Sequence, residues 1–249
     1  MTKDIINLKN DYYIEVIEPD DELPVNSINL KNLKLADILN KKVITFHIDL
    51  QKIDAKEYKK ILKRLLSIKN IAMKTKKRIG TNKGEKNIVA YISNFNEANK
   101  EQQDFVSGIR AVFYNSRYER YNYIYDAVCD YLDGYFYGKN LCDFQNNKCG
   151  EKRNTSSVTG CCHQFKHKAL GPFSKLVLCE YLNKENYTCD AKCISCKLFT
   201  CDYLRSKGVQ FKIKDILLLD VFFNPIQKYF IKYMVFTPKE KILKRLVKL

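Results

Sequence analysis

The sequence predicts an α+β protein that is mostly helical, with a small N-terminal mixed α/β part and a cysteine-rich metal-binding module. The candidate strands, which are short β-branched and aromatic runs, lie in about the first 95 residues. Apolar residues recur at helical spacing on both sides of the cysteine-rich stretch. Nine of the ten cysteines lie between residues 139 and 205. The expected regions are therefore a mixed α/β region at residues 1–95, a helical segment at residues 96–138, the module at residues 139–205, and C-terminal helices at residues 206–249 that pack on the module.

The N-terminal region is expected to combine strands with one helix. Tyr12 to Ile17 and Val43 to Leu50 have the composition of strands, and Asn87 to Ile92 is a third candidate strand. Between Asp54 and Ser67 the apolar residues fall on one helical face, and Asp54 followed three residues later by Glu is typical of a capping box. The basic stretch 74–86 lacks the Gly-Lys-Ser/Thr ending of a phosphate-binding loop, so we interpret it as a solvated turn.

Helical spacing dominates the middle of the chain. A first helix is marked by Phe105, Ile109, Val112 and Phe113. A stripe at steps of three and four follows, formed by Tyr114, Tyr118, Tyr121, Tyr125, Val128 and Leu132. Tyrosines next to arginines can stack nucleic-acid bases, but an aromatic stripe at this spacing is more often core, and we interpret it as core.

Two helix starts are predicted near the C-terminus. Asn224-Pro225 and Thr237-Pro238 each combine a cap residue with a first-turn proline and a later Gln or Glu. The helix after the second start is amphipathic and basic. A membrane or RNA surface would suit such a helix, but docking on its own domain is its more common fate.

The charge of the chain favours a polyanionic partner. There are 44 Lys and Arg against 28 Asp and Glu, a net charge of +16, which suits nucleic acid bound through basic faces or an anionic membrane face. Ordinary solvated helix faces explain much of the lysine equally well. No signal peptide and no transmembrane apolar run is recognised, so we expect a cytoplasmic protein whose cysteines are metal ligands or buried thiols rather than disulfides.

The clustered cysteines predict a metal site. Structural zinc and iron–sulfur clusters take four thiolates, or three with a histidine. The candidate ligands are Cys142, Cys149, Cys161, Cys162, Cys179, Cys189, Cys193, Cys196, Cys201 and His163. Cysteine is also a small buried hydrophobe, which explains a helical face of cysteines but not the adjacent pair Cys161-Cys162.

Two local patterns refine this expectation. Cys129, Cys179 and Cys201 each begin a Cys-acid-Tyr-Leu sequence, which favours a shared geometry with the thiolate facing a metal. The C-x3-C-x2-C spacing of Cys189 to Cys196 is that of radical S-adenosylmethionine enzymes. In those enzymes an aromatic residue usually stands where Ser195 is, and most of a barrel follows the motif, whereas only 53 residues follow Cys196 here. That identity is therefore not favoured.

The stretch 142–200 resembles the YkgJ-type cysteine-cluster proteins, which include the flagellin lysine N-methylases. The resemblance rests on Gly160-Cys161-Cys162, on Cys179-Glu-Tyr-Leu, on Cys189, and on Cys196-Lys-Leu-Phe. It implies a zinc- or iron-chelating cluster. It also implies that Cys161, Cys162, Cys179, Cys189 and Cys196 are ligands.

Three functions follow as hypotheses. The first is a metal-binding protein in which zinc or an iron–sulfur centre organises residues 142–201. The second is an iron–sulfur-dependent redox or methyl-transfer enzyme with its centre at Cys189, Cys193 and Cys196. The third is a nucleic-acid-binding protein with a structural zinc module. Whether the chain is an enzyme stays open at this point, because no catalytic motif of a known class is present.

Overall fold

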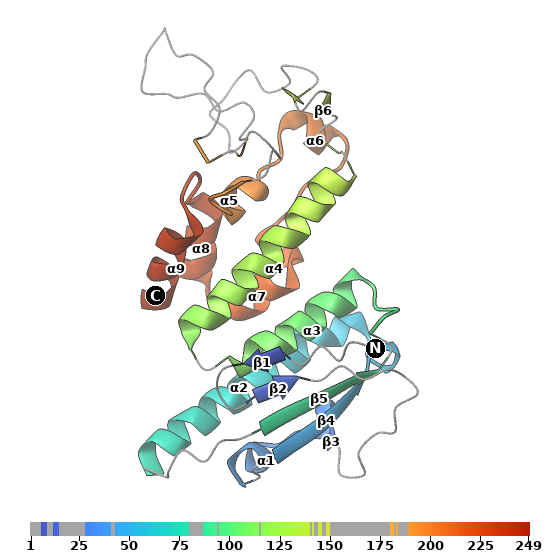
Figure 1. Cartoon of the computed structure of the whole chain (residues 1–249), viewed down its shortest axis with the longest axis vertical. Coiled ribbons are helices and arrows are strands. Elements are labelled where there is room, and N and C mark those ends of the chain that lie inside the picture. The colour runs from blue at the N-terminus through green and yellow to red at the C-terminus, as the bar shows by residue number, and fades with distance from the viewer. Residues whose placement is uncertain are drawn as a thin grey trace. The chain divides into compact units, whose positions relative to one another are not determined.

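The computed structural model describes residues 6–8, 12–14, 28–40, 43–79, 87–93, 95–114, 116–139, 141, 144–145, 148–149, 180–181, 183 and 189–249 (Figure 1). Of the predictions, the end of the first strand, residues 80–86 of the basic turn and much of the cysteine-rich stretch lie outside these residues. The prediction of a turn is wrong for residues 74–79, which continue the preceding helix to Ile79. The chain divides into two compact units, Met1–Arg120 and Tyr121–Leu249. The described portion is mostly helical with a small parallel sheet, which confirms the α+β class.

The first unit contains a three-stranded parallel sheet in the order β3 (Ile28–Asn29), β4 (Val43–Asp49) and β5 (Asn87–Ser93). Phe46 of β4 is aligned with Ile28 on one side and Ala90 on the other. A two-stranded antiparallel hairpin, β1 (Ile6–Leu8) and β2 (Tyr12–Ile14), precedes the sheet. The predicted strands at 43–50 and 87–92 are therefore confirmed.

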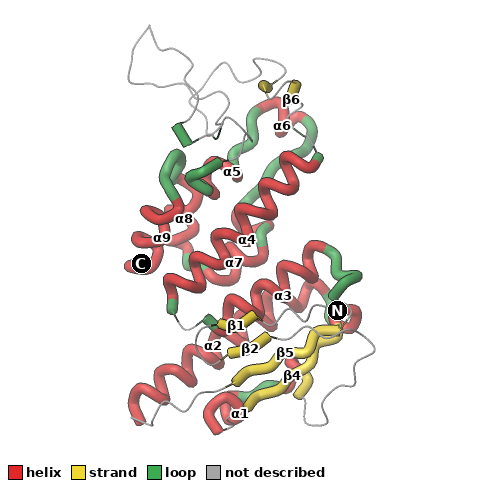
Figure 2. Tube along the Cα trace, in the orientation of Figure 1, coloured by secondary structure: helices red, strands yellow, loops and turns green. Residues whose placement is uncertain are grey.

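The helical elements of the first unit are η1 (Leu30–Asn32), α1 (Leu35–Asn40), η2 (Leu50–Lys52), α2 (Ala55–Ile79) and α3 (Lys100–Phe113). Helix α2 connects β4 to the parallel strand β5, as such a crossover requires. Helices α2 and α3 lie side by side on one face of the sheet (Figure 2). Alternate residues of β4 are buried on that face, where the Phe46 ring lies 6.0 Å from the ring of Phe113.

A glycine allows α2 and α3 to pack closely. A Cβ added at Gly108 of α3 would lie 2.5 Å from Cδ1 of Leu62 on α2, which is well inside van der Waals contact. Next to this approach the rings of Tyr58 and Phe105 stack with centroids 4.4 Å apart. The α2–α3 interface therefore depends on the absence of a side chain at Gly108 as well as on the apolar side chains around it.

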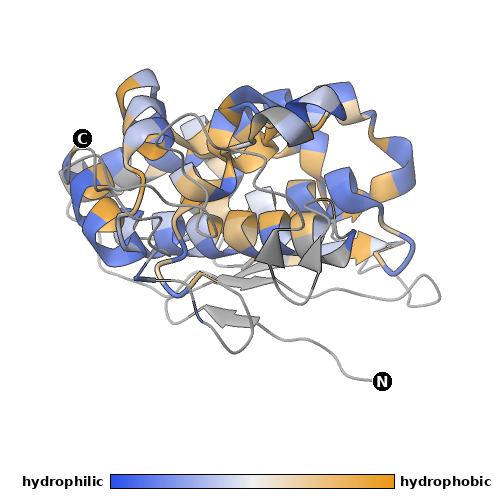
Figure 3. Cartoon of the chain, turned by 90° about the horizontal axis from the view of Figure 1, so that it is seen from above, coloured by the Kyte–Doolittle hydropathy of each residue, from blue (hydrophilic) through white to orange (hydrophobic). Residues whose placement is uncertain are grey.

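The second unit is a group of helices around α4 (Arg117–Gly138), which begins in the last residues of the first unit. The other elements of this unit are β6 (Phe144–Gln145), β7 (Lys148–Cys149), α5 (Ile194–Lys197), α6 (Asp202–Ser206), η5 (Ile213–Asp215), α7 (Leu217–Phe222), α8 (Pro225–Tyr233) and α9 (Lys239–Lys248). Strands β6 and β7 form an antiparallel pair. Apolar and polar residues alternate around the helices, as amphipathic helices require (Figure 3).

The predicted aromatic stripe forms the core of α4 over most of its length. Tyr121, Tyr125, Val128 and Leu132 are buried, which confirms the interpretation as core for these four. Tyr118 is 37% exposed. The remaining member, Tyr114, is the C-cap residue of α3 and lies before α4, so the stripe is not one continuous helix.

The two predicted C-terminal helices are present. Asn224 and Gln227 form the reciprocal capping box of α8 with Pro225 in its first turn, as predicted. Helix α9 begins after Pro238, one residue later than predicted, and the Thr237 hydroxyl donates to the carbonyl of Val235 (3.1 Å) instead of capping the helix. The apolar face of α9 is buried, so this helix docks on its own unit. None of the helices in the described ranges combines the length and the hydropathy needed to cross a bilayer.

Candidate functional site

Cys193 and Cys196 form a pair of buried thiols at the start of α5. Cys193 is the N-cap residue of this helix and Cys196 lies within its one turn, so the spacing of three brings both sulfurs to the same side. The two residues are 1% and 8% exposed, and their thiols are in hydrogen-bond contact. Two of the sequence-predicted ligands are therefore brought together.

The loop 234–238 between α8 and α9 supplies backbone donors to this pair. The N–H of Phe236 donates to Sγ of Cys196 over 3.1 Å, and the N–H of Thr237 donates to Cys193. Phe236 has a φ of 53°, in the left-handed region that is uncommon for residues other than glycine. This conformation directs consecutive amides toward neighbouring sulfurs, and amides that converge in this way stabilise negative charge.

These contacts shift the pKa values of the two cysteines in opposite directions. The hydrogen bond from the Cys196 thiol lowers the pKa of Cys193 against the opposing effect of burial, and backbone N–H groups of Cys196 and Thr237 lower it further. The same thiol–thiol contact, together with burial, raises the pKa of Cys196. Sγ of Cys193 also lies 3.3 Å from the carbonyl of Met234, to which the protonated thiol donates. Cys193 is therefore the thiol of the pair whose pKa is lowered, and the thiolate is the form of cysteine that binds metals.

The loop 189–193 is held next to the thiol pair by backbone hydrogen bonds. The N–H of Lys239, at the start of α9, donates to the carbonyl of Ala191 over 2.9 Å. Lys192 has a φ of 45°, so this loop also contains a left-handed residue that is not glycine. Two left-handed residues therefore lie in the two loops that surround the sulfurs, and such conformations persist only where the surrounding contacts hold them.

Cys129 of α4 also lies at this site, although it was not among the predicted ligands. It is fully buried, and its thiol donates to the carbonyl of Lys192 over 3.2 Å. Burial is the main cause that raises the pKa of Cys129; Lys197 opposes this effect, and the carboxylates of Asp133 and Asp126 add to it. One turn earlier on α4, the hydroxyl of Tyr125 accepts a hydrogen bond from the N–H of Ile194 (3.1 Å). The signal for Cys129 in the sequence was the Cys-acid-Tyr-Leu pattern that it shares with Cys201.

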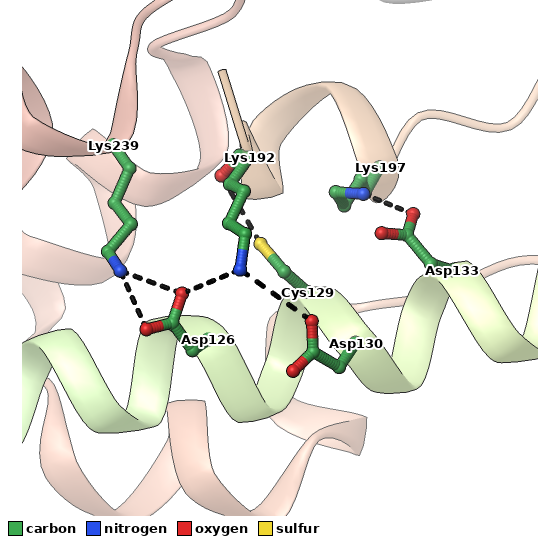
Figure 4. Close-up of polar contacts among 7 residues, drawn as sticks. All are labelled: Asp126, Cys129, Asp130, Asp133, Lys192, Lys197 and Lys239. Atoms are coloured by element: carbon green, nitrogen blue, oxygen red, sulfur yellow. Dashed lines mark hydrogen bonds and ion pairs between the residues drawn. The ribbon is translucent and has the colours of Figure 1, made fainter. Parts of the chain in front are cut away.

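Ion pairs hold both loops against α4 (Figure 4). The participants are Asp126, Asp130 and Asp133 on one face of α4 and the lysines Lys192, Lys197 and Lys239. Nζ of Lys239 lies 2.7 Å from both carboxylate oxygens of Asp126, and Nζ of Lys192 lies 3.2 Å from the first of them. Lys197, next to Cys196, pairs with Asp133. The acidic face of α4 therefore contacts each segment that carries or covers the thiol pair.

The other predicted ligands are described less completely. Cys189 and Cys201 are half-buried, and Cys201 is the N-cap residue of α6. Of Cys149 only the backbone, in β7, is described. The predictions at Cys142, Cys161, Cys162, Cys179 and His163 lie outside the described residues. Within the described portion of the chain, no three Cys, His, Asp or Glu side chains are arranged to hold a metal ion.

Comparison with known proteins found no matching family model, no matching curated protein and no matching solved structure.

Proposed function

We propose that the chain is a metal-binding cysteine-cluster protein that holds zinc or an iron–sulfur centre through cysteines of residues 142–201. The observation that supports this proposal is the buried Cys193–Cys196 pair with backbone N–H donors on both sulfurs. Metal binding requires deprotonated thiols, and burial in an apolar site disfavours them. Backbone donors offset this cost, and hydrogen bonds to sulfur are also what tunes metal–thiolate sites.

The described pair supplies two members of a ligand set. Zinc and iron–sulfur centres take four thiolates, or three and a histidine. Cys189 lies on the same segment, but the described side chains of Cys189, Cys193 and Cys196 are not arranged to hold a metal ion together, so at least the next ligand is proposed from elsewhere in residues 142–201. The others are proposed among Cys142, Cys149, Cys161, Cys162, Cys179, Cys201 and His163. Cys129 is not proposed as a ligand, because burial raises its pKa and favours the protonated thiol.

The test is elemental analysis and an optical spectrum of the full chain purified without oxygen. We expect stoichiometric zinc in a colourless protein, or iron with the visible absorption of an iron–sulfur centre. The spectrum also addresses the enzyme hypothesis, because a redox or methyl-transfer enzyme built on an iron–sulfur centre requires the coloured form. A chain that contains neither metal, and takes up neither when it is refolded with them, contradicts the proposal.

Single substitutions make the test specific to the pair. Cys193→Ala and Cys196→Ala are expected to lose most of the metal, because each removes a thiolate from the same site. Ser195→Ala, between them, is the control for local disturbance, since it removes only a hydrogen bond to the carbonyl of Ile231. Cys129→Ala is the control for a nearby thiol that is not a ligand. Equal metal loss in all four variants would mean that folding, not ligation, determines metal content.

A nucleic-acid partner remains the second proposal for the positive charge of the chain. Binding through lysine and arginine releases counterions, so affinity for an arbitrary oligonucleotide should fall steeply with salt. An affinity that is absent at low salt contradicts this partner. That outcome leaves the metal proposal intact.

A further inference from the structure

Helix α8 presents an apolar face that the described helices of the second unit leave exposed. Ile226, Tyr229 and Tyr233 are 59%, 62% and 55% exposed, and Val235 in the following loop is 39% exposed. The three helical positions are separated by three and four residues, so they share one face, while Gln227 and Ile231 are buried on the other. We name Ile226, Tyr229, Tyr233 and Val235 the outer face of α8.

The two tyrosines of the outer face form one surface. Their ring centroids lie 4.6 Å apart, and Nζ of Lys232 lies 4.9 Å from the centroid of the Tyr233 ring. At the end of α8, Nη1 of Arg245 from α9 lies 3.6 Å from the sulfur of Met234, between Tyr233 and Val235 in sequence. Two cations therefore border the exposed apolar side chains.

The C-terminal segment that carries the outer face is strongly positive. Residues 225–249 contain one acidic residue, Glu240, and seven basic residues. Two of the basic residues, Lys228 and Lys239, pair with Asp220 and Asp126. The other five are exposed on α8 and α9 and are Lys232, Lys241, Lys244, Arg245 and Lys248. Such a surface is complementary to a polyanion that also has an apolar layer.

We propose that the outer face of α8 docks the second unit on an anionic lipid surface. A lipid surface satisfies both features together, because the interface accepts the apolar side chains while its headgroups attract the lysines and Arg245. Tyrosine is suited to the boundary between the headgroups and the acyl chains, because its ring can lie in the apolar layer while its hydroxyl stays in water. Single-stranded nucleic acid would engage the tyrosines by stacking, but it offers no apolar medium for the aliphatic Ile226 and Val235. The inference is independent of the metal proposal.

The first experiment measures sedimentation of the full chain with vesicles of phosphatidylcholine, with and without about one third phosphatidylglycerol. We expect binding to the anionic vesicles only. One positive side chain near such a surface changes the partition by about fivefold, so Lys232→Gln and Arg245→Gln should each weaken binding by about that factor. The double variant Tyr229→Ser/Tyr233→Ser should weaken it at least about tenfold, because it removes most of the aromatic area.

Matched controls come from the first unit. Lys60→Gln removes an exposed lysine of α2, and Tyr118→Ser removes a tyrosine that is 37% exposed on α4. Tyr118→Ser should leave vesicle binding unchanged, and Lys60→Gln should change it only by the small effect of one unit of net charge. Far-UV circular dichroism and thermal midpoints of all variants exclude loss of fold as the cause of weaker binding.

A second experiment reports the contact itself. The chain contains no tryptophan, so Tyr229→Trp creates a single reporter on the outer face, and Tyr118→Trp creates the control. We expect the emission of the first to shift to the blue and to be quenched by brominated lipid in anionic vesicles, and that of the second to stay unchanged.

Three results overturn the proposal. The first is no binding to anionic vesicles, or binding that the control variants weaken as much as the double tyrosine variant does. The second is binding of an oligonucleotide, but not of vesicles, that depends on Tyr229 and Tyr233. The third is a dimer that the double tyrosine variant abolishes, with no vesicle binding, since the outer face would then be covered by a second copy of the chain.

Discussion

Asp126 is the residue whose change should loosen both loops of the thiol site at once. Its carboxylate contacts Lys239 through both oxygens at 2.7 Å and Lys192 at 3.2 Å. The Lys239 side chain is 15% exposed and that of Asp126 32%, whereas Lys192 is 45% exposed. Asp126→Asn keeps the shape of the side chain but removes its charge, so it tests the ion pairs rather than the packing.

The expected magnitude follows from these exposures. Hydrogen bonds to a charged group contribute about 1.5–3 kcal/mol when they are partly shielded, and exposed ion pairs about 0–1 kcal/mol. The Lys239 contact falls near the lower end of the first range, and the Lys192 contact in the second. We expect a loss of about 2 kcal/mol, which is about a 30-fold change in a local opening equilibrium.

Hydrogen–deuterium exchange measures this opening directly. The N–H of Lys239 donates to Ala191, and that of Phe236 donates to Cys196, so both amides should exchange faster in Asp126→Asn while β4 and β5 keep their protection. Asp130→Asn is the matched control, because Asp130 is 70% exposed and 3.9 Å from Lys192. Unchanged exchange at Lys239 and Phe236, or an equal effect in the control, would refute the reasoning.

Two further predictions concern buried polar groups. Lys69 is buried beside Arg120. Burial is the larger cause and the charge of Arg120 the smaller cause that lower the pKa of Lys69 from 10.5 to about 6. Between about pH 6 and 10 this lysine is therefore protonated in the unfolded chain but neutral in the folded one, so the free energy of unfolding should rise with pH through this window. Lys69→Met should remove that rise, and parallel pH profiles of the thermal midpoint for variant and parent would contradict the assignment. Gln227 is 3% exposed, and its amide donates to the Tyr121 hydroxyl at 3.1 Å and to the Leu246 carbonyl at 2.7 Å. Gln227→Leu should cost about 2–4 kcal/mol in urea unfolding, because both acceptors stay buried and the N–H of Asn224 loses its capping acceptor. A loss within experimental error would show that water replaces the amide.

Local sequence patterns were sufficient to predict several of the observed elements. The strand β4 follows from alternating β-branched and aromatic residues, and the start of α8 follows from Asn224, Pro225 and Gln227 acting within four residues of one another. The burial of Tyr121 and Tyr125 follows from helical spacing. Each of these features depends on side chains that are near neighbours in the sequence, so a short window contains the physical cause.

Only the tertiary structure shows which distant segments pair and which of their side chains are in contact. The parallel pairing of β3, β4 and β5 joins segments whose composition does not state their order or direction. Cys129 meets the carbonyl of Lys192, and Cys196 meets the N–H of Phe236, 40 residues further along the chain. The sequence by itself indicated that cysteines gather near residue 190 and that thiols are suited to a metal. Which thiol has the lower pKa depends on the contact between Cys193 and Cys196, which are close in sequence, and on the amides of Phe236 and Thr237, which reach the sulfurs only once distant segments have packed.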